Sequence, residues 1–266
     1  MRQSINSLEK MNSNLKKILI VFDAAGCTPV SMRIATDLAA SMQSGIQALY
    51  IEDINILNAA DLPFTREVSL HTAAISSIDS TLMIQKFRAD AENIKKQIEK
   101  IALTSSVSLS FSSARGQKTQ LIKHRREEIS MVLIPAAYST TGKKDQQHLK
   151  HVLAMVYDNH KPSNEKALNI AISQAVKNNY QLFVIVDSQH SKQHVEQLIK
   201  QQSTDESYPA PACQIADFSS ADDIFLLLQK HSPELLMLTE DSRLIDTEQA
   251  LQRLINSLEC DILIVR

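Results

Sequence analysis

The hydrophobic pattern of the chain contains one arrangement twice, in which a short apolar strand leads into a helix with an apolar face. The two copies span residues 16–40 and 150–175. In each copy the apolar run ends at an aromatic–Asp pair, Phe22-Asp23 or Tyr157-Asp158, and a polar turn containing a proline follows. Strands of a parallel sheet that is covered on both faces have this continuous apolar character. The repetition predicts two similar α/β units in one chain.

The second half of the chain predicts a complete unit in which strands alternate with helices. The predicted strands are 152–157, 181–186, 213–216, 235–238 and 261–265, and the predicted helices are 163–178, 190–202, 220–231 and 246–258. This alternation is typical of an open, parallel, doubly wound sheet with right-handed crossovers.

The first half predicts a similar but incomplete unit. After the first strand and helix, we expect strands at 46–51, 107–111 and 129–134, with helices at 81–103 and 117–128. The polar stretch that follows is too short for another helix and strand. The predicted organisation is an N-terminal polar segment 1–15, a first domain 16–135, a linker 136–149 and a second domain 150–266.

Residues 54–80 interrupt the first domain as an insertion that is too long for an ordinary connection and too apolar for a plain linker. We expect it to be packed. Its apolar centre, Leu62-Pro63-Phe64, either packs over the sheet or forms a surface for a partner protein.

Composition excludes several classes of protein. The net charge is −2, so the chain lacks the basic excess of a dedicated nucleic-acid binder. Its three cysteines are widely separated, which favours reduced thiols in a reducing compartment. No apolar segment resembles a signal peptide or reaches the length of a membrane span. We therefore expect a cytoplasmic protein that binds neither nucleic acid nor membrane.

Glycine is scarce, and this restricts the possible chemistry. The chain has four glycines, and none lies between Lys143 and Arg266. Loops that cradle phosphates use glycine for close backbone approach and for positive φ angles. No Walker A, kinase or GxGxxG motif is present.

Several segments, taken in order, resemble the universal stress protein family in a tandem form. They are the first strands ILIVFD and VLAMVYD, the turn Ala114-Arg115-Gly116, the fourth strands SMVLIPA and ELLMLTEDS, and the closing LECDILIVR. The resemblance covers residues 16–266. It implies two Rossmann-like units of the adenine nucleotide alpha hydrolase-like kind and a role in the stress response.

In ATP-binding members of that family, an Asp after the first strand lies at the adenine–ribose end of the site, and a loop Gly-x2-Gly-x9-Gly-Ser/Thr holds the phosphates. By position, the aspartates are Asp23 and Asp158. The first two loop glycines correspond to Thr239 and Ser242, and the third falls near Glu248. These four residues, Asp23, Asp158, Thr239 and Ser242, would contact a nucleotide if one is bound.

This chain lacks the glycines of the family's phosphate-binding loop, which predicts a degenerate nucleotide site. In the second half, the segment 239–242 contains Glu240 and Asp241, whose carboxylates repel a triphosphate. In the first half, the chain after Pro135 is too short to hold the loop and its helix. We therefore expect no cofactor, with ATP or AMP as doubtful ligands.

Each candidate residue also has a structural interpretation. Because the phosphate loop is missing, Asp23 and Asp158 are better explained as caps of the helices that follow them than as ligand contacts. His190 and His194 have the spacing of a metal-binding helix, but no further ligand stands near them in the sequence, so a solvated face is favoured. Ser163 is better explained as a helix N-cap than as a nucleophile. No residue is predicted to be catalytic or to bind a metal.

Two further features have the same ambiguity. The basic run 123–126 could contact phosphate, but the acidic pair 127–128 follows it and favours a solvated helix end. Cys27 stands near a predicted helix N-terminus, where thiols become more acidic. It has no neighbouring cysteine in the sequence, which argues against redox sensing.

Three functions remain open at this point. The first is a non-enzymatic stress-response regulator with a degenerate nucleotide site, acting through protein contacts. The second is a binder of an adenine nucleotide or another small molecule, and the third is an enzyme acting on nucleotides. The last strand, 261–265, would pair with another segment of this chain or with a second copy. An exposed apolar edge there would favour a homodimer.

Overall fold

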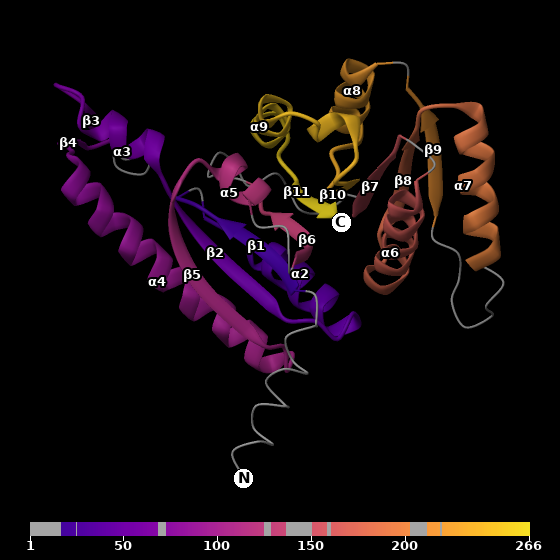
Figure 1. Cartoon of the computed structure of the whole chain (residues 1–266), viewed down its shortest axis with the longest axis horizontal. Helices are drawn as coiled ribbons and strands as arrows, with labels where there is room; N and C mark the ends of the chain where they lie inside the picture. Colours follow the sequence, from indigo (N-terminus) through magenta and orange to yellow (C-terminus); the bar gives the residue numbers. More distant parts are fainter. Residues whose placement is uncertain are drawn as a thin grey trace, which may run out of the picture. The chain divides into compact units, whose positions relative to one another are not determined.

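The computed structural model describes residues 17–24, 26–68, 73–124, 129–136, 151–158, 161–202, 212–218 and 220–266. The chain forms two compact units, Met1–Ser130 and Met131–Arg266. Strands in each unit are joined mainly in parallel and alternate with helices (Figure 1). The predicted α/β class with open, mostly parallel sheets is confirmed. Almost all of the predicted linker 136–149 lies outside the described residues.

The first unit has a parallel sheet in the order β5-β2-β1. Its elements are β1 (Lys17–Phe22), α2 (Pro29–Ser41), β2 (Ile46–Asp53), α4 (Ser80–Thr104), β5 (Leu109–Gly116) and α5 (Lys118–His124). Residues 18–22 of β1 and 48–51 of β2 are buried, which explains their continuous apolar sequence. Thr28 caps α2 by accepting from the N–H of Ser31, and Pro29 begins the helix with a suitable φ angle.

Helix α4 covers this sheet with one apolar face. Its buried residues recur every three or four positions: Phe87, Ala91, Ile94, Ile98 and Ala102. Asp79 fixes the start of the helix by accepting from the N–H of Leu82 at 2.8 Å.

Strand β5 is longer than predicted. It continues to Gly116 and pairs with β2 along its whole length, so Ala114-Arg115-Gly116 lies inside the strand and forms no turn. The serines at 112 and 113 obscured this extension because they break the apolar pattern. They are tolerated because no residue of β5 is fully buried.

The insertion at 54–80 contains α3 (Ile54–Ala60) and a two-stranded antiparallel ribbon, β3 (Arg66–Val68) and β4 (Ile75–Ser77). Helix α3 is packed through the buried Leu57 and Ala60 and lies beside α4 (Figure 1). Of the two alternatives for its apolar centre, packing over the sheet is wrong, because Leu62 is 61% exposed and Phe64 is 98% exposed. The ribbon has only two strands, too few to bury both of its faces.

The second unit has six strands in the order β6-β11-β10-β7-β8-β9. They are β6 (Ile129–Ile134, of which 131–134 belong to this unit), β7 (Val152–Tyr157), β8 (Gln181–Val186), β9 (Cys213–Asp217), β10 (Leu235–Thr239) and β11 (Asp261–Val265). The helices are α6 (Pro162–Asn178), α7 (Gln189–Gln202), α8 (Ala221–His231) and α9 (Glu248–Ser257), with a 3-10 turn η1 (Arg243–Ile245).

The last strand, β11, finds its second partner within the chain. It pairs in parallel with β10 and antiparallel with β6, where Leu263 lies opposite Leu133. Asp261 fixes the end of this pair by accepting from the N–H of Ala136 at 2.9 Å. The β11 edge is therefore occupied, and a homodimer has to use another surface. Among the described residues, no helix is long and apolar enough to cross a membrane.

Candidate functional site

In the second unit, β7 is the strand at which the chain order of the sheet reverses. It lies between β10 and β8, so a crevice for ligands is expected at the carboxyl ends of β7 and β10. The residue that follows β7 is Asp158, whose side chain is 1% exposed. The segment that follows β10 is 240–245, which includes Ser242 and the turn η1.

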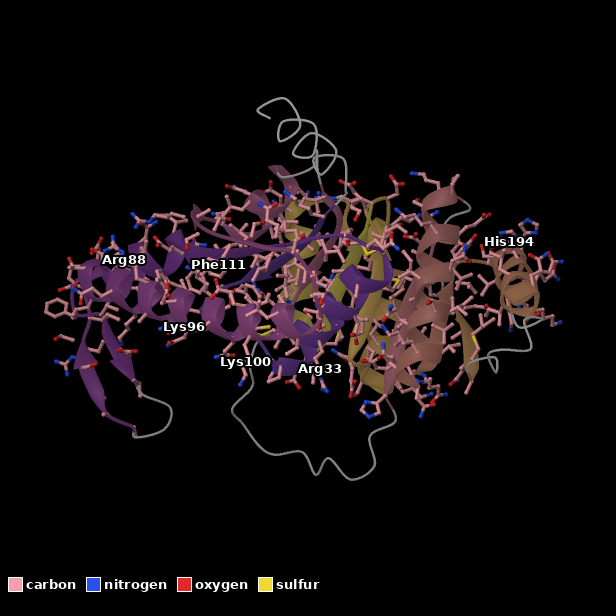
Figure 2. All side chains as sticks on the ribbon, turned by 90° about the horizontal axis from the view of Figure 1, so that it is seen from below. Arg33, Arg88, Lys96, Lys100, Phe111 and His194 are labelled. Atoms are coloured by element: carbon pink, nitrogen blue, oxygen red, sulfur yellow. The ribbon has the colours of Figure 1, made fainter. Side chains whose placement is uncertain are left out.

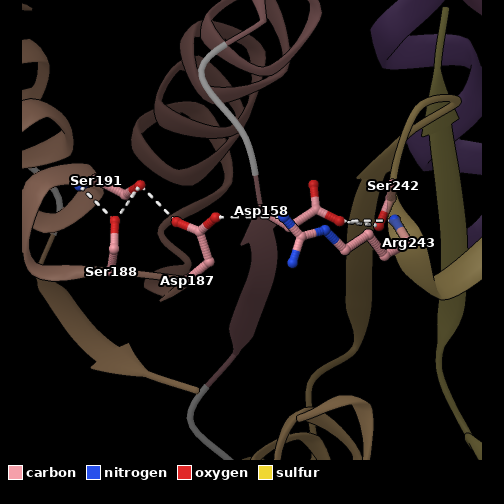
Figure 3. A network of polar contacts seen from close by, with 6 residues as sticks. All are labelled: Asp158, Asp187, Ser188, Ser191, Ser242 and Arg243. Atoms are coloured by element: carbon pink, nitrogen blue, oxygen red, sulfur yellow. Dashed lines mark hydrogen bonds and ion pairs between the residues drawn. The ribbon is translucent and has the colours of Figure 1, made fainter. Parts of the chain in front are cut away.

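Asp158 accepts hydrogen bonds from this segment (Figure 3). Its Oδ2 accepts from the hydroxyl of Ser242 at 2.9 Å and from the backbone N–H of Arg243 at 2.7 Å. Ser242 is itself 1% exposed, and its hydroxyl oxygen accepts from the N–H of Leu244 at 3.3 Å. The carboxylate therefore holds the loop after β10 against the end of β7.

The Arg243 side chain extends this network toward β8. Its guanidinium lies 4.0 Å from Oδ2 of Asp187, which follows that strand. Asp187 Oδ1 accepts from the hydroxyl of Ser191 at 2.6 Å, and the hydroxyls of Ser191 and Ser188 are 3.0 Å apart (Figure 3). Ser188 Oγ also accepts from the N–H of Ser191 at 3.2 Å, near the start of α7. One connected set of polar groups thus ties together the ends of β7, β8 and β10.

The acidic residues of the same loop are also paired. Asp241 lies 3.2 Å from the ammonium of Lys161 and accepts from the hydroxyl of Ser163 at 3.2 Å. Glu240 lies 3.7 Å from the guanidinium of Arg266. These contacts neutralise the carboxylates that the sequence presents after β10.

Thr239 is the last residue of β10 and is fully buried. Its hydroxyl lies 3.5 Å from Oδ1 of Asn164, a buried residue in the first turn of α6. The structure therefore brings Asp158, Thr239 and Ser242 to one end of the second sheet.

In the first unit, Asp23 has a different environment. It follows β1 and forms an ion pair with Lys118, the first residue of α5. The side chain of Asp23 is 24% exposed and that of Lys118 is 12% exposed. The backbone carbonyl of Asp23 accepts from the N–H of Gly26, whose φ angle of 84° suits a glycine in this turn.

Neither aspartate caps the helix that follows it, so this structural interpretation is wrong. Thr28 caps α2, and the N-cap residue of α6, Lys161, makes no side-chain cap hydrogen bond. Ser163 is likewise not an N-cap, because its hydroxyl donates to Asp241. Asp158 instead supports a turn more than eighty residues later in the chain. No local sequence signal indicates this contact, because its partners lie 84 and 85 residues away in the chain.

Burial changes the acidity of Tyr157, the residue before Asp158. Burial first, and then the charges of Glu165 and Asp187, raise the pKa of Tyr157 to about 12 from its ordinary value of 10. The phenol therefore stays protonated at neutral pH. Its ring lies 6.3 Å from that of His194.

The remaining candidates have local partners. His194 Nε2 lies 3.1 Å from Oε1 of Glu165. The described residues contain no group of three or more His, Cys, Asp or Glu that would hold a metal ion. Cys27 Sγ donates to the carbonyl of Thr28 at 3.4 Å. In the basic run 123–126, residues 125 and 126 lie outside the described part of the chain.

Similar architectures occur among solved structures. A universal stress protein from Archaeoglobus fulgidus DSM 4304 matches with a TM-score of 0.51 at 10% identity, over 93% of this chain and 96% of that protein. This chain has the universal stress protein fold. A putative universal stress protein from Pseudomonas aeruginosa UCBPP-PA14 is similar at a TM-score of 0.43 and 11% identity, over 96% and 94% of the two chains. No protein-family model and no curated protein sequence matches the chain.

Proposed function

We propose that this chain is a non-enzymatic regulatory protein of the universal stress type, which acts in the cytoplasm through contacts with other proteins. The observation that carries the proposal is that the Asp158 side chain is buried and its carboxylate is already hydrogen-bonded within the chain. Asp158 is 1% exposed, and its carboxylate accepts from the hydroxyl of Ser242 and the N–H of Arg243. A nucleotide that used Asp158 would have to displace both donors, which leaves buried polar groups without partners at a cost of about 1–3 kcal/mol each.

The backbone of the same loop supports this proposal. A phosphate cradle needs N–H groups that point at the ligand. Here the N–H of Glu240 donates to Val265, that of Ser242 donates to Thr239, and that of Arg243 donates to Asp158. These donors are committed to acceptors within the chain, and no glycine is present in the loop to allow another path.

The exposed apolar residues of the insertion support the part of the proposal that concerns protein contacts. Leu62, Phe64, Val68 and Ile75 are each more than half exposed, at 61%, 98%, 55% and 62%. Val68 and Ile75 lie opposite each other in the ribbon, and a cluster of exposed apolar side chains is typical of surfaces that contact other proteins. The ion pair between Glu67 and Lys86 holds the ribbon to α4.

The test is native mass spectrometry of freshly purified protein, together with calorimetric titration of ATP and AMP. The proposal expects no retained nucleotide and no binding heat at ligand concentrations up to about 1 mM. Any binding would then be weaker than a dissociation constant of about 1 mM, which corresponds to a binding free energy of about −4 kcal/mol. Micromolar binding that is abolished in Asp158→Ala would contradict it. That result would favour an adenine-nucleotide-binding protein.

A further inference from the structure

The sheet of the first unit ends at β5, whose outer edge has no partner strand among the described residues. The N–H of Ile46 donates to the carbonyl of Ser108 at 2.8 Å. Backbone groups of alternate residues in a parallel strand point to the same neighbour. The N–H and C=O groups of Leu109, Phe111 and Ser113 therefore point away from β2 and along the open edge.

This edge lacks the features that normally prevent strand pairing. Proteins protect exposed edges with short strands, charges, prolines or bulges. From Leu109 to Ala114, β5 has no charged residue and no proline, and it pairs with β2 without interruption. By contrast, β9 at the edge of the second unit has five residues and ends in Asp217.

Beside this edge, α4 and β5 border a cavity of about 440 Å³. Lys95, Glu99 and Leu103 line it from the helix, and Leu109 and Phe111 line it from the strand. Leu103 is 81% exposed, and Phe111 lies beside α4 (Figure 2). The cavity therefore combines an apolar floor with one positive and one negative side chain.

We propose that a second copy of this chain pairs antiparallel with β5 about a two-fold axis beside Phe111. A two-fold interface must be complementary to itself, because each contact occurs twice with the partners exchanged. Lys95 and Glu99 lie four residues apart on α4, so the axis brings each Lys95 toward Glu99 of the partner subunit. The outward backbone groups of Leu109, Phe111 and Ser113 then form the hydrogen bonds of an antiparallel pair.

The self-complementary charges favour a second copy over an unrelated extended peptide. A peptide would satisfy the edge backbone, but it would need its own matching acid and base to satisfy both Lys95 and Glu99. An identical edge supplies them automatically. Pairing also buries Leu103 and the two Phe111 rings, whose contact stabilises the dimer further.

The first experiment is sedimentation velocity of the full chain between about 1 and 100 μM, a range that covers affinities near −8 kcal/mol. We expect a reversible dimer. Ser113→Pro removes an outward N–H and leaves the bonds to β2 intact, so the dissociation constant should rise at least about ten-fold. The matched control is Cys213→Pro on β9, whose N–H points outward by the same rule because Leu182 donates to Ala212. This control should leave the dimer unchanged.

The second experiment tests the charges, and it does not depend on a proline being tolerated. Lys95→Glu alone or Glu99→Lys alone should weaken the dimer about three- to ten-fold, because like charges then meet twice across the axis. The double variant Lys95→Glu/Glu99→Lys should restore the wild-type dissociation constant. A chain that stays monomeric at every concentration would overturn the proposal. So would a dimer that only Cys213→Pro weakens, or a double variant that does not recover.

Discussion

Removing the Asp158 carboxylate should destabilise the second unit strongly. In Asp158→Ala, the Ser242 hydroxyl and the Arg243 N–H lose an acceptor to which they donate at 2.9 and 2.7 Å. Hydrogen bonds to a charged acceptor contribute about 1.5–3 kcal/mol each. Water entering the space left by the side chain recovers part of this loss. We therefore expect the free energy of unfolding to fall by about 3–4 kcal/mol.

The assay is equilibrium unfolding in urea, followed by circular dichroism at neutral pH. Asp158→Asn is the matched control, because its amide oxygen can accept both bonds in the place of Oδ2 and only the charge is lost. It should cost about 1 kcal/mol. A ligand-binding carboxylate behaves differently, since replacing a functional residue often stabilises the fold. If Asp158→Ala unfolds within about 0.5 kcal/mol of wild type, or is more stable, the carboxylate does not hold the loop and the reasoning fails.

Three further predictions concern charge and pH. Asp23→Ala should cost only about 0.5–1 kcal/mol in urea unfolding, because its pair with Lys118 is partly exposed; a loss as large as that of Asp158→Ala would contradict this. Burial raises the pKa of Tyr157 to about 12, above its unfolded value, so its contribution is complete below pH 10 and is lost as the pH rises. Between about pH 9 and 11, the free energy of unfolding of Tyr157→Phe should therefore fall by about 1.3 kcal/mol less than that of the wild type. An equal fall in the two proteins would show that the raised pKa of Tyr157 does not contribute to stability. Burial, with the charge of Lys230, lowers the pKa of His231, which stacks on Phe183 at 3.9 Å. The stability should therefore fall as the pH drops below the pKa of histidine in the unfolded chain. In thermal melts, the melting temperature of His231→Gln should fall less steeply with decreasing pH than that of the wild type. An equally steep fall in the variant would be evidence against this origin.

The strands of the second unit could be predicted closely because burial dictates their sequence. The observed bounds of β7, β8 and β11 are the predicted ones, and nearly all of their residues are buried. The period of apolar residues predicted α4 for the same reason. Strand β5 was cut short because an edge strand has no buried face to impose a pattern on residues 112–116.

The candidate site was only partly predictable. The position of Asp158 after an apolar strand identified it as a residue of interest, and the family pattern placed Ser242 near it. The partner relationship depends on contacts between residues 84 and 85 positions apart. No local propensity encodes such a contact. The pairing of β11 with β6 was left open for the same reason, since two apolar strands do not specify which edges meet.

The most direct measurement is amide hydrogen exchange at Ser242, Arg243 and Leu244, with and without ATP. Each of these N–H groups donates to an acceptor within the chain, to Thr239, Asp158 and Ser242 respectively. The account predicts slow exchange in the ligand-free protein and no change on adding millimolar ATP. Rapid exchange that slows when ATP is added would mean that these groups await a phosphate, which would contradict a closed site.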